Sequence, residues 1–345
     1  MMNSKILVSL AGGLAAAILF FGVFGGGVFG VPLLFVSPLP IALLAFGWGL
    51  DAAIGGALAG AAIVGLLVAA LLGPVAIATS ATSAVAVSNF GLVFAVAFLL
   101  LVAVPMAIYA YLVLLARHRP GSAGDDADPA PVEWFPLPRV LLVVALGTAG
   151  TLILAGWLSG YSVDRFAPEM ADVLAPLTGE AVATADPEQL AAARRTLAFL
   201  PPTFGLLWTA VMIVNLWLGA VVARRSGRLA RPWPDIAMAI DMPLPGFVVF
   251  AAALLGIAAP GPIGLAAATL AGALAVVFIA IGFAVLHVTS RDNPARPVLL
   301  GVAYAVAILF TLPVFLLALI GIAERFLRLR EKKAQSPPRG ARPRS

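Results

Sequence analysis

Polar side chains that could carry chemistry are few within the apolar runs of this sequence. Asn215 lies in the middle of the run VMIVNLWLG, and His287 lies near the end of another long apolar run. A polar group at membrane depth is costly to bury, so each of the two is a functional candidate by default. For Asn215 the alternative interpretation is a hydrogen bond between neighbouring helices.

The topology argued below places His287 at the outer level of a membrane, where other polar and aromatic residues also fall. These residues are Asn89, Trp157, Tyr161, Trp208 and Tyr304. Together with His287 they are expected to form a substrate-binding cup beneath a lid made by residues 25–38, whose glycines disfavour a stable helix. The alternative interpretation is a belt of aromatic residues at the headgroup level.

Motifs of the common enzyme classes are absent from the sequence. It contains no GxxxxGK[ST], HExxH or GxSxG motif, and it has no cysteine and two histidines. Nucleophiles, bases and metal ligands are therefore too few for a membrane-embedded enzyme, and the chain has no ATP-binding motif of its own. We predict a protein that is not an enzyme and that holds no cofactor and no metal.

The composition places the chain in a membrane. Hydrophobic residues make up 62% of it and charged residues 11%, and the mean hydropathy is +1.07. Asp51 is the only charge between Lys5 and Arg117. Globular domains carry about 25% charged residues. We therefore predict an all-α protein, a polytopic bundle of transmembrane helices in contact with the lipid bilayer.

Apolar runs separated by charged or Gly/Pro-rich stretches divide the chain, because a span needs about 20 apolar residues. The run 38–73 is expected to turn over at Gly47–Asp51, as a hairpin inside the bilayer. Pro105 is expected to kink a long helix, and Pro201-Pro202 to end a surface helix. The predicted parts are an N-terminal four-helix transmembrane unit 1–116, a loop 117–139, a transmembrane hairpin 140–223 with an extracytoplasmic insertion 161–200, an interfacial segment 224–246, a C-terminal transmembrane unit 247–323 and a basic tail 324–345.

Basic residues orient these parts. The N-terminus, two of the loops and the tail all favour the cytoplasm, which requires an even number of crossings. We predict eight crossings, with both termini in the cytoplasm of a bacterial inner membrane. The short run 247–259 is then a re-entrant segment, the run 297–323 crosses, and Arg291 and Arg296 face outward.

The excess of positive charge is local. The segment from Glu324 to Ser345 holds eight Lys or Arg and two Glu, whereas the whole chain has a net charge of +5. Such a tail is a poor signal for nucleic acid, and we expect no nucleic-acid partner. Arg325, Arg328 and Lys332 are expected to bind anionic lipid, and a plain topological anchor is the alternative.

Small residues recur at four-residue spacing in several helices. Ala11 and Ala15 form one such pair, and Gly56 and Gly60 form another. Ridges of this kind let helix backbones approach closely in lipid. They are expected to pack helices of the same chain or, as the alternative, to dock a partner membrane protein.

Short motifs follow one another along nearly the whole chain. They are Pro38-Leu39-Pro40, Val104-Pro105-Met106, Glu133-Trp134-Phe135-Pro136, Asn215-Leu216-Trp217-Leu218, Arg228-Leu229-Ala230-Arg231-Pro232-Trp233-Pro234-Asp235, Val285-Leu286-His287, Gly321 and Arg328-Leu329-Arg330. In types and order they resemble the DUF2232, or YybS-like, family of bacterial integral membrane proteins. Glu324 stands where that family usually has Asp, a change that keeps the charge.

That family is distantly similar to the substrate-binding S components of energy-coupling-factor vitamin transporters. The resemblance implies that Ala11 and Ala15 contact a membrane coupling protein, which works with an ATPase, and that residues 25–38 close over a vitamin-type substrate. The three extra helical segments here depart from the six-helix pattern of S components. Two hypotheses follow: a substrate-capture subunit for small-molecule uptake, or a non-transporting membrane scaffold or regulatory protein with a housekeeping or envelope role.

Overall fold

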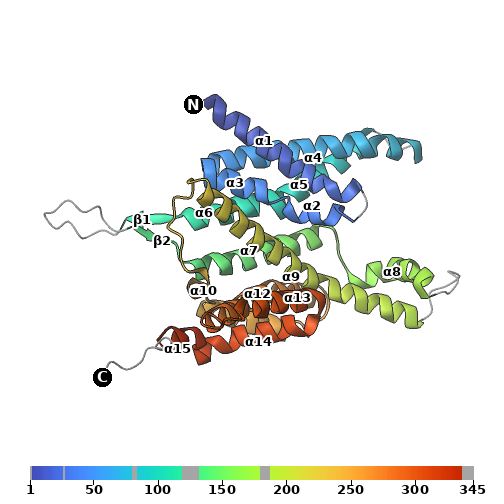
Figure 1. Ribbon diagram of the computed structural model, residues 1–345. Coiled ribbons are helices and arrows are strands. Elements are labelled where there is room, and N and C mark those ends of the chain that lie inside the picture. The colour runs from blue at the N-terminus through green and yellow to red at the C-terminus, as the bar shows by residue number, and fades with distance from the viewer. Residues whose placement is uncertain (1, 26–27, 80–83, 119–131, 179–186, 336–345) are drawn as a thin grey trace, which may run out of the picture. The chain divides into compact units, whose positions relative to one another are not determined.

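The computed structural model describes residues 2–25, 28–79, 84–118, 132–178 and 187–335 (Figure 1). Within these residues its elements are helices and one pair of short strands. Contacts divide the chain into two compact units, which we describe separately. Unit 1 comprises Met1–Pro136, Gly150–Gly160 and Trp208–Pro232, and unit 2 comprises Leu137–Ala149, Tyr161–Leu207 and Trp233–Ser345.

Seven helical stretches in the described residues are long and apolar enough to cross a membrane, and a sharply bent pair of helices makes an eighth if it is counted as one span. The seven are Ser4–Phe24, Gly30–Trp48, Leu50–Leu71, Phe90–Leu114, Leu137–Leu158, Pro187–Arg225 and Gly261–Thr289. Their lengths match the roughly 20 residues that a bilayer requires. The prediction of an all-α, polytopic membrane protein is confirmed.

Unit 1 contains α1 (Met2–Phe21) and the predicted hairpin, which consists of α3 (Leu39–Trp48) and α4 (Leu50–Thr79). Gly49 makes the turn with a φ of 93°, a conformation that glycine adopts readily because it has no Cβ. Asp51 lies in the first turn of α4, where a carboxylate interacts favourably with the helix dipole. The prediction of a turn at Gly47–Asp51 is confirmed.

Glycines bring helices of unit 1 close together. A Cβ atom at Gly13 in α1 would lie 2.5 Å from the carbonyl oxygen of Gly56 in α4, and one at Gly60 would lie 2.9 Å from the ring of Phe98. These separations are too short for any side chain. Gly56 and Gly60 therefore pack helices of this chain against one another, the first of the two uses expected for the small-residue ridges.

The stretch expected to form a lid is largely helical. Gly22–Gly25 form the short helix η1, and α2 (Gly30–Val36) leads through Ser37 and Pro38 into α3. Gly26 and Gly27 lie outside the described residues. The expectation that the glycines of 25–38 disfavour a helix is therefore wrong for the part that the structure describes, and the lid stays a prediction. Pro32 sits in the first turn of α2, where a helix tolerates its missing amide hydrogen.

The helix that contains Pro105 is interrupted as predicted. It consists of α5 (Ala84–Phe98), a π-helical turn η2 (Leu99–Ala103) and α6 (Val104–Leu114). Pro105 has no amide hydrogen to donate to the carbonyl of Leu101, four residues earlier. The indole Nε1 of Trp208 donates a hydrogen bond to that carbonyl at 2.8 Å. An aromatic side chain of another segment thus satisfies the acceptor that the proline leaves free.

Replacing Trp208 with Phe should lower the free energy of unfolding by about 1 kcal/mol, because the Leu101 carbonyl loses its donor. In a Pro105→Ala background the same replacement should cost less, because the alanine supplies an amide donor for that carbonyl. Denaturant titration of the four proteins in mixed micelles gives both costs. Trp217→Phe is the control, since Trp217 is exposed. Equal costs in the two backgrounds would show that Pro105 and Trp208 are not coupled.

The loop 117–139 contains regular structure near its ends. Strand β1 (Ala116–His118) pairs antiparallel with β2 (Val132–Trp134), and Arg117 is opposite Glu133. The two side chains form an exposed ion pair at 2.9 Å. Such a pair contributes about 0 to 1 kcal/mol, so the strand pairing mainly fixes the register. Residues 119–131 lie outside the described residues.

Helices α7 (Leu137–Leu158) and α9 (Pro187–Arg225) contribute residues to both units. In unit 2, α8 (Val163–Thr178) lies beside the first part of α9 (Figure 1). Helix α9 continues through Pro201 and Pro202, so the expectation that these prolines end the helix is wrong. Each proline removes one backbone donor, and neighbouring groups in a membrane protein can replace such donors.

The core of unit 2 is α12 (Gly261–Thr289), the most deeply buried of the candidate spans. Helix α11 (Leu244–Gly256) runs antiparallel to it, with Phe247 and Phe250 on Phe278 and Gly256 close to Ala267. The short helix α10 (Ile236–Ala239) also packs on α12. The segment from Asp235 to Gly256 therefore follows α12 along most of its length. Helix α11 is too short to count among the candidate spans, and the re-entrant segment 247–259 stays a prediction.

The last apolar run is bent rather than straight. Between α13 (Arg296–Leu309) and α14 (Thr311–Leu327) the chain bends by 117° from a straight helix. Pro313 explains the break, because its ring would clash with the carbonyl of Leu309 in a continuous helix. Helix α14 packs against α12 through Gly282 and Gly321, each of which faces backbone of the other helix. The chain ends its described part in α15 (Leu329–Gln335).

Both ends of this bent pair lie at the same end of unit 2. Lys333, after α14, pairs with Asp292, before α13, at 2.6 Å. Arg291 pairs with Asp235, at the start of the α10–α11 segment. The pair α13–α14 thus has the arrangement of a re-entrant hairpin, one of the two forms that such a bent pair can take, the other being a broken span. That 297–323 crosses the membrane, and that Arg291 and Arg296 face outward, stay predictions.

Candidate functional site

The residues expected to form a cup are described unit by unit, and those that form hydrogen bonds do so with different groups. In unit 1, Trp208 is held by the carbonyl of Leu101, and Trp157 has 74% of its surface exposed. The side chain of Asn89 lies outside the described residues. In unit 2, His287 Nε2 is 2.9 Å from the hydroxyl of Tyr304, whose ring stacks on Phe283 at 4.5 Å between centroids. The structure thus brings His287 and Tyr304 together, as the prediction requires for these two.

Tyr161 lies at the other end of α12 from His287. It lines a hollow together with Gly261 and Leu265 in the first turns of that helix, whereas His287 belongs to its last turn. A rise of 1.5 Å per residue makes a helix of 29 residues about 43 Å long. Tyr161 and His287 therefore lie at opposite ends of α12, and the prediction of one cup that holds both residues is wrong.

Two hollows adjoin Tyr161 within unit 2. The first, of about 280 Å³, is lined by Tyr161, Phe166, Glu169, Met170 and Leu197. The second, of about 250 Å³, is lined by residues of three segments that converge here: the start of α8, Ala198 in α9, and the turn between α11 and α12. We call the two together the Tyr161 hollow. Its walls are mostly apolar with a few polar groups, the usual composition of a small-molecule site.

Helix α9 positions Tyr161 through its prolines. Pro201 has no amide hydrogen for the carbonyl of Leu197, and the hydroxyl of Tyr161 donates to that carbonyl at 2.7 Å. The ring of Tyr161 also stacks on Phe166. Pro202 likewise offers no donor to the carbonyl of Ala198, a residue that lines the hollow. A hydrogen-bond donor on a bound molecule would therefore find an acceptor at this position.

The rim of the Tyr161 hollow carries opposite charges. Asp164, at the start of α8, forms an exposed ion pair at 3.2 Å with Arg194 of α9. The pair ties the two helices beside the hollow, although exposed ion pairs contribute little to stability. Ser162 adds a hydroxyl between Tyr161 and Asp164. The site thus combines an aromatic wall with carboxylate, hydroxyl and carbonyl oxygens.

Burial raises the pKa of the Tyr161 hydroxyl above its ordinary value of 10.0. The folded state therefore favours the neutral form, which donates to Leu197, and this contribution is lost as the pH rises through the raised pKa. Below pH 10, Tyr161→Phe should lower the free energy of unfolding by about 1 kcal/mol. The difference between the two proteins should shrink at higher pH, as measured by denaturant titration at a series of pH values. A constant difference would contradict this assignment.

Asn215 makes the interhelical hydrogen bond that was one of its two interpretations. Its Nδ2 donates to the carbonyls of Phe35 at 2.7 Å and of Val211 at 2.8 Å. Phe35 lies near the break between α2 and α3, where Pro38 interrupts the backbone bonds. Asn215 Oδ1 is buried, and no donor among the described residues reaches it. The side chain therefore joins α9 to the α2–α3 break within unit 1.

Arginines after α9 bind the ends of two helices in unit 1. Arg228 donates to the carbonyl of Gly47 at 3.2 Å and lies over the ring of Trp48, at the end of α3. Arg231 donates to the carbonyls of Val113, near the end of α6, and of Phe135. Burial lowers the pKa of Arg231 from its ordinary value. The predicted hairpin turn, the β-strand pair and the arginine segment thus meet at one end of unit 1.

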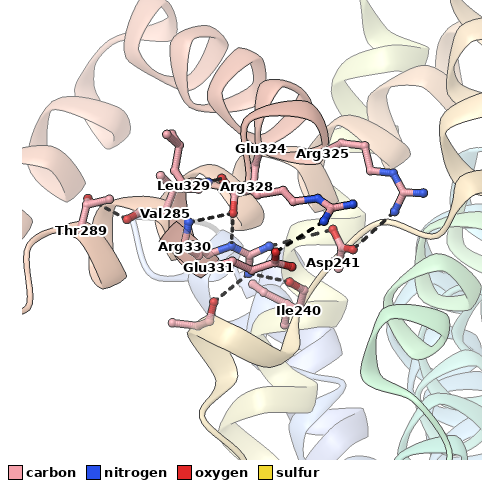
Figure 2. A network of polar contacts seen from close by, with 11 residues as sticks. Ile240, Asp241, Val285, Thr289, Glu324, Arg325, Arg328, Leu329, Arg330 and Glu331 are labelled. Atoms are coloured by element: carbon pink, nitrogen blue, oxygen red, sulfur yellow. Dashed lines mark hydrogen bonds and ion pairs between the residues drawn. The ribbon is translucent and has the colours of Figure 1, made fainter. Parts of the chain in front are cut away.

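A buried ion pair connects the end of α14 to the chain around α10 in unit 2 (Figure 2). Glu324 and Arg330 are 5% and 6% exposed, and Arg330 Nε lies 2.9 Å from Glu324 Oε1. Glu324 also accepts from the amides of Leu329 and Arg330. Arg330 donates to the carbonyls of Ala237 and Ile240 at 2.8 Å each. We call Glu324 and Arg330, with these partners, the C-terminal clamp.

No protein-family model, curated protein or solved structure matches the chain. The resemblance to DUF2232 rests on the quoted motifs alone. Two of these motifs now have a structural role, since Asn215 joins helices and Arg330 forms the clamp. Among the described residues, no group of three His, Cys, Asp or Glu side chains lies close enough to hold a metal ion.

Glu324 and Arg330 were not predicted as a buried pair, because in the sequence they stand among the basic residues of the tail. One signal was present: Arg325, Arg328 and Lys332 share one helical face, whereas Arg330 lies out of phase with them. The left-handed conformation of Arg328, with a φ of 48°, ends α14 and turns the chain so that Arg330 comes back to Glu324. Glycine usually occupies such a left-handed position at a helix end, and here the residue is Arg328, so the sequence does not indicate the turn.

Proposed function

We propose that this protein captures a small molecule at the Tyr161 hollow and presents it to a membrane partner for uptake. The observation that supports this function is the convergence of α8, α9 and the α11–α12 turn on one mostly apolar hollow with oxygen acceptors at its rim. Tyr161 and Phe166 supply a flat wall, and the oxygens orient a molecule that carries hydrogen-bond donors. The cup that included His287 is not part of this proposal.

The distribution of basic residues supports an outward-facing hollow. In unit 2, Arg291, Arg325, Arg330 and Lys333 gather at the end of α12 that is far from Tyr161. The positive-inside rule assigns this basic end to the cytoplasm. Eight crossings then arise with the α10–α11 segment as the seventh and α12 as the eighth. Both termini are cytoplasmic, and the membrane is the bacterial inner membrane.

The energy for uptake comes from partners in this proposal, a membrane coupling protein and an ATPase. The resemblance to S components places their contact at Ala11 and Ala15. Ala11 is exposed on α1, where it is flanked by the exposed Leu10 and Leu14. This face of α1 is turned away from the Gly13 contact with α4. A coupling protein therefore finds a small-residue surface that the fold of unit 1 leaves uncovered.

Blocking the hollow tests the capture function. Ala198→Trp fills it from an exposed position of α9, and Ala192→Trp is the matched control at another exposed alanine of the same helix. Mass spectrometry would identify small molecules released from each purified protein. The native chain and the Ala192→Trp variant should release a molecule that Ala198→Trp does not. Identical sets from all three proteins would contradict capture at this site.

The exposed Ala11 face favours a second candidate, a non-transporting scaffold or regulatory protein. Such a protein needs the partner surface on α1 but not the Tyr161 hollow. Ala11→Phe should then abolish the cellular phenotype of the gene, whereas Ala198→Trp should leave it unchanged. The capture function predicts loss with both variants, so the pair of substitutions separates the two functions.

A further inference from the structure

None of the 14 residues of helix α13 is buried. Its partner α14 packs on α12 through Gly282 and Gly321. Helix α13 instead exposes apolar side chains along its length, with Val298 at 69%, Val302 at 56% and Ile308 at 82% exposed. In a membrane such a surface contacts lipid chains.

The base of this helix carries an arginine without an acidic partner. Among the described residues, Arg291 pairs with Asp235 and Lys333 pairs with Asp292, whereas Arg296 has no carboxylate within ion-pair distance. Its Nε atom is buried and finds no hydrogen-bond partner in the part of the chain that the structure describes. A charged donor in this state is poorly satisfied, and an added anion would supply the missing acceptor.

The start of α13 also suits an anion, because the positive end of the helix dipole lies there. Of its first-turn amides, that of Arg296 donates to the carbonyl of Asn293 and Pro297 has no amide hydrogen, so the Arg296 side chain is the main donor. His287, in the last turn of α12, contacts the Tyr304 hydroxyl at 2.9 Å. Tyr304, in the middle of α13, therefore joins this helix to the last turn of α12.

The length of α13 fits one leaflet of a bilayer. Fourteen residues rise about 21 Å, and half of the hydrocarbon core is about 15 Å. With Arg296 at the headgroup level, the bend at Phe310 reaches the middle of the membrane. A phospholipid of the same leaflet then runs parallel to α13, with its phosphate at Arg296 and an acyl chain along Val298, Val302 and Ile308.

We propose that the re-entrant hairpin binds an anionic phospholipid, whose phosphate is held by the side chain of Arg296 at the start of α13 and whose acyl chain lies on the exposed side of that helix. The site is independent of the Tyr161 hollow, at the other end of α12. It also differs from the tail expected to bind lipid, because the described basic residues Arg325, Arg328, Arg330 and Lys333 have carboxylates nearby.

Lipid retention measured by native mass spectrometry tests the site. The full-length protein is titrated with phosphatidylglycerol, with phosphatidylcholine or with inorganic phosphate in neutral detergent. We expect one phosphatidylglycerol to bind the native chain more tightly than phosphatidylcholine, and about fivefold more weakly to Arg296→Gln. Arg296→Lys should retain most of the binding. Arg325→Gln is the matched control and should bind like the native chain.

Three outcomes would overturn the proposal. Equal binding of phosphatidylcholine would show that charge plays no part. Equal stabilisation by inorganic phosphate, measured as a shift in melting temperature, would assign the site to a free anion rather than a lipid. Equal losses in Arg296→Gln and Arg325→Gln would indicate general attraction to the basic end of unit 2. Melting temperatures in lipid-free detergent show whether each variant is folded before titration.

Discussion

Arg330→Met should lower the free energy of unfolding by about 3 to 5 kcal/mol, because it leaves Glu324 buried without its counter-charge. The carbonyls of Ala237 and Ile240 lose their donors at the same time. Ala237 lies in the short helix α10 and Ile240 directly follows it, before α11 begins, so few backbone amides are available to these carbonyls. Unfolding in mixed micelles, followed by circular dichroism, measures the effect.

Arg328→Gln is the control for this loss. Arg328 is exposed and lies 3.8 Å from Glu331, so its replacement should change the free energy of unfolding by less than about 1 kcal/mol. The double variant Glu324→Gln, Arg330→Met should recover part of the stability, since no buried charge remains. A loss in Arg330→Met no larger than that in Arg328→Gln would show that the clamp is not buried in the membrane-bound protein.

Cysteines placed at Asn293 and Gln335 should react with an impermeant maleimide on the same side of the membrane, and a cysteine at Ala258 on the opposite side. Asn293 and Gln335 flank the hairpin α13–α14, whereas Ala258 lies in the turn between α11 and α12. All three positions are exposed, and the chain has no native cysteine to interfere. In intact cells Ala258→Cys should be labelled, and the other two only after lysis.

Lysed cells provide the control for this experiment, because all three variants should then react equally. Labelling of Asn293→Cys but not of Gln335→Cys in intact cells would mean that the last apolar run crosses the membrane. Failure of Ala258→Cys to react in intact cells, with reaction after lysis, would mean that the α10–α11 segment does not cross. Either result would contradict the re-entrant hairpin or the crossing order proposed above.

Local chemistry made several features of the fold predictable. Gly47–Asp51 was found as a turn because glycine and a helix-starting acid interrupt an otherwise uniform apolar run. The interruption before Pro105 followed from the missing amide hydrogen. The two uses expected for Asn215 included the one observed, because a buried amide in lipid needs hydrogen-bond acceptors.

Other features depended on contacts between distant segments, which composition and spacing do not reveal. Pro201-Pro202 reads as a helix end, yet α9 continues because Tyr161 supplies a donor for the Leu197 carbonyl. The run 297–323 reads as a span, yet it bends near Pro313 because α14 can pack on α12. The cup failed for the same reason: once the α10–α11 segment follows α12, His287 and Tyr161 lie at opposite ends.

The re-entrant hairpin has a consequence for how the protein is made. Its two helices together are apolar enough to be threaded across the membrane as one span during synthesis. Glu324 and Arg330, which fix the end of α14, follow the apolar run. The carbonyls of Ala237 and Ile240, to which Arg330 donates, are synthesised long before it. Arg330 can reach these carbonyls only after it has itself left the ribosome, so the C-terminal clamp forms after the segment from Asp235 to Ile240 has been made.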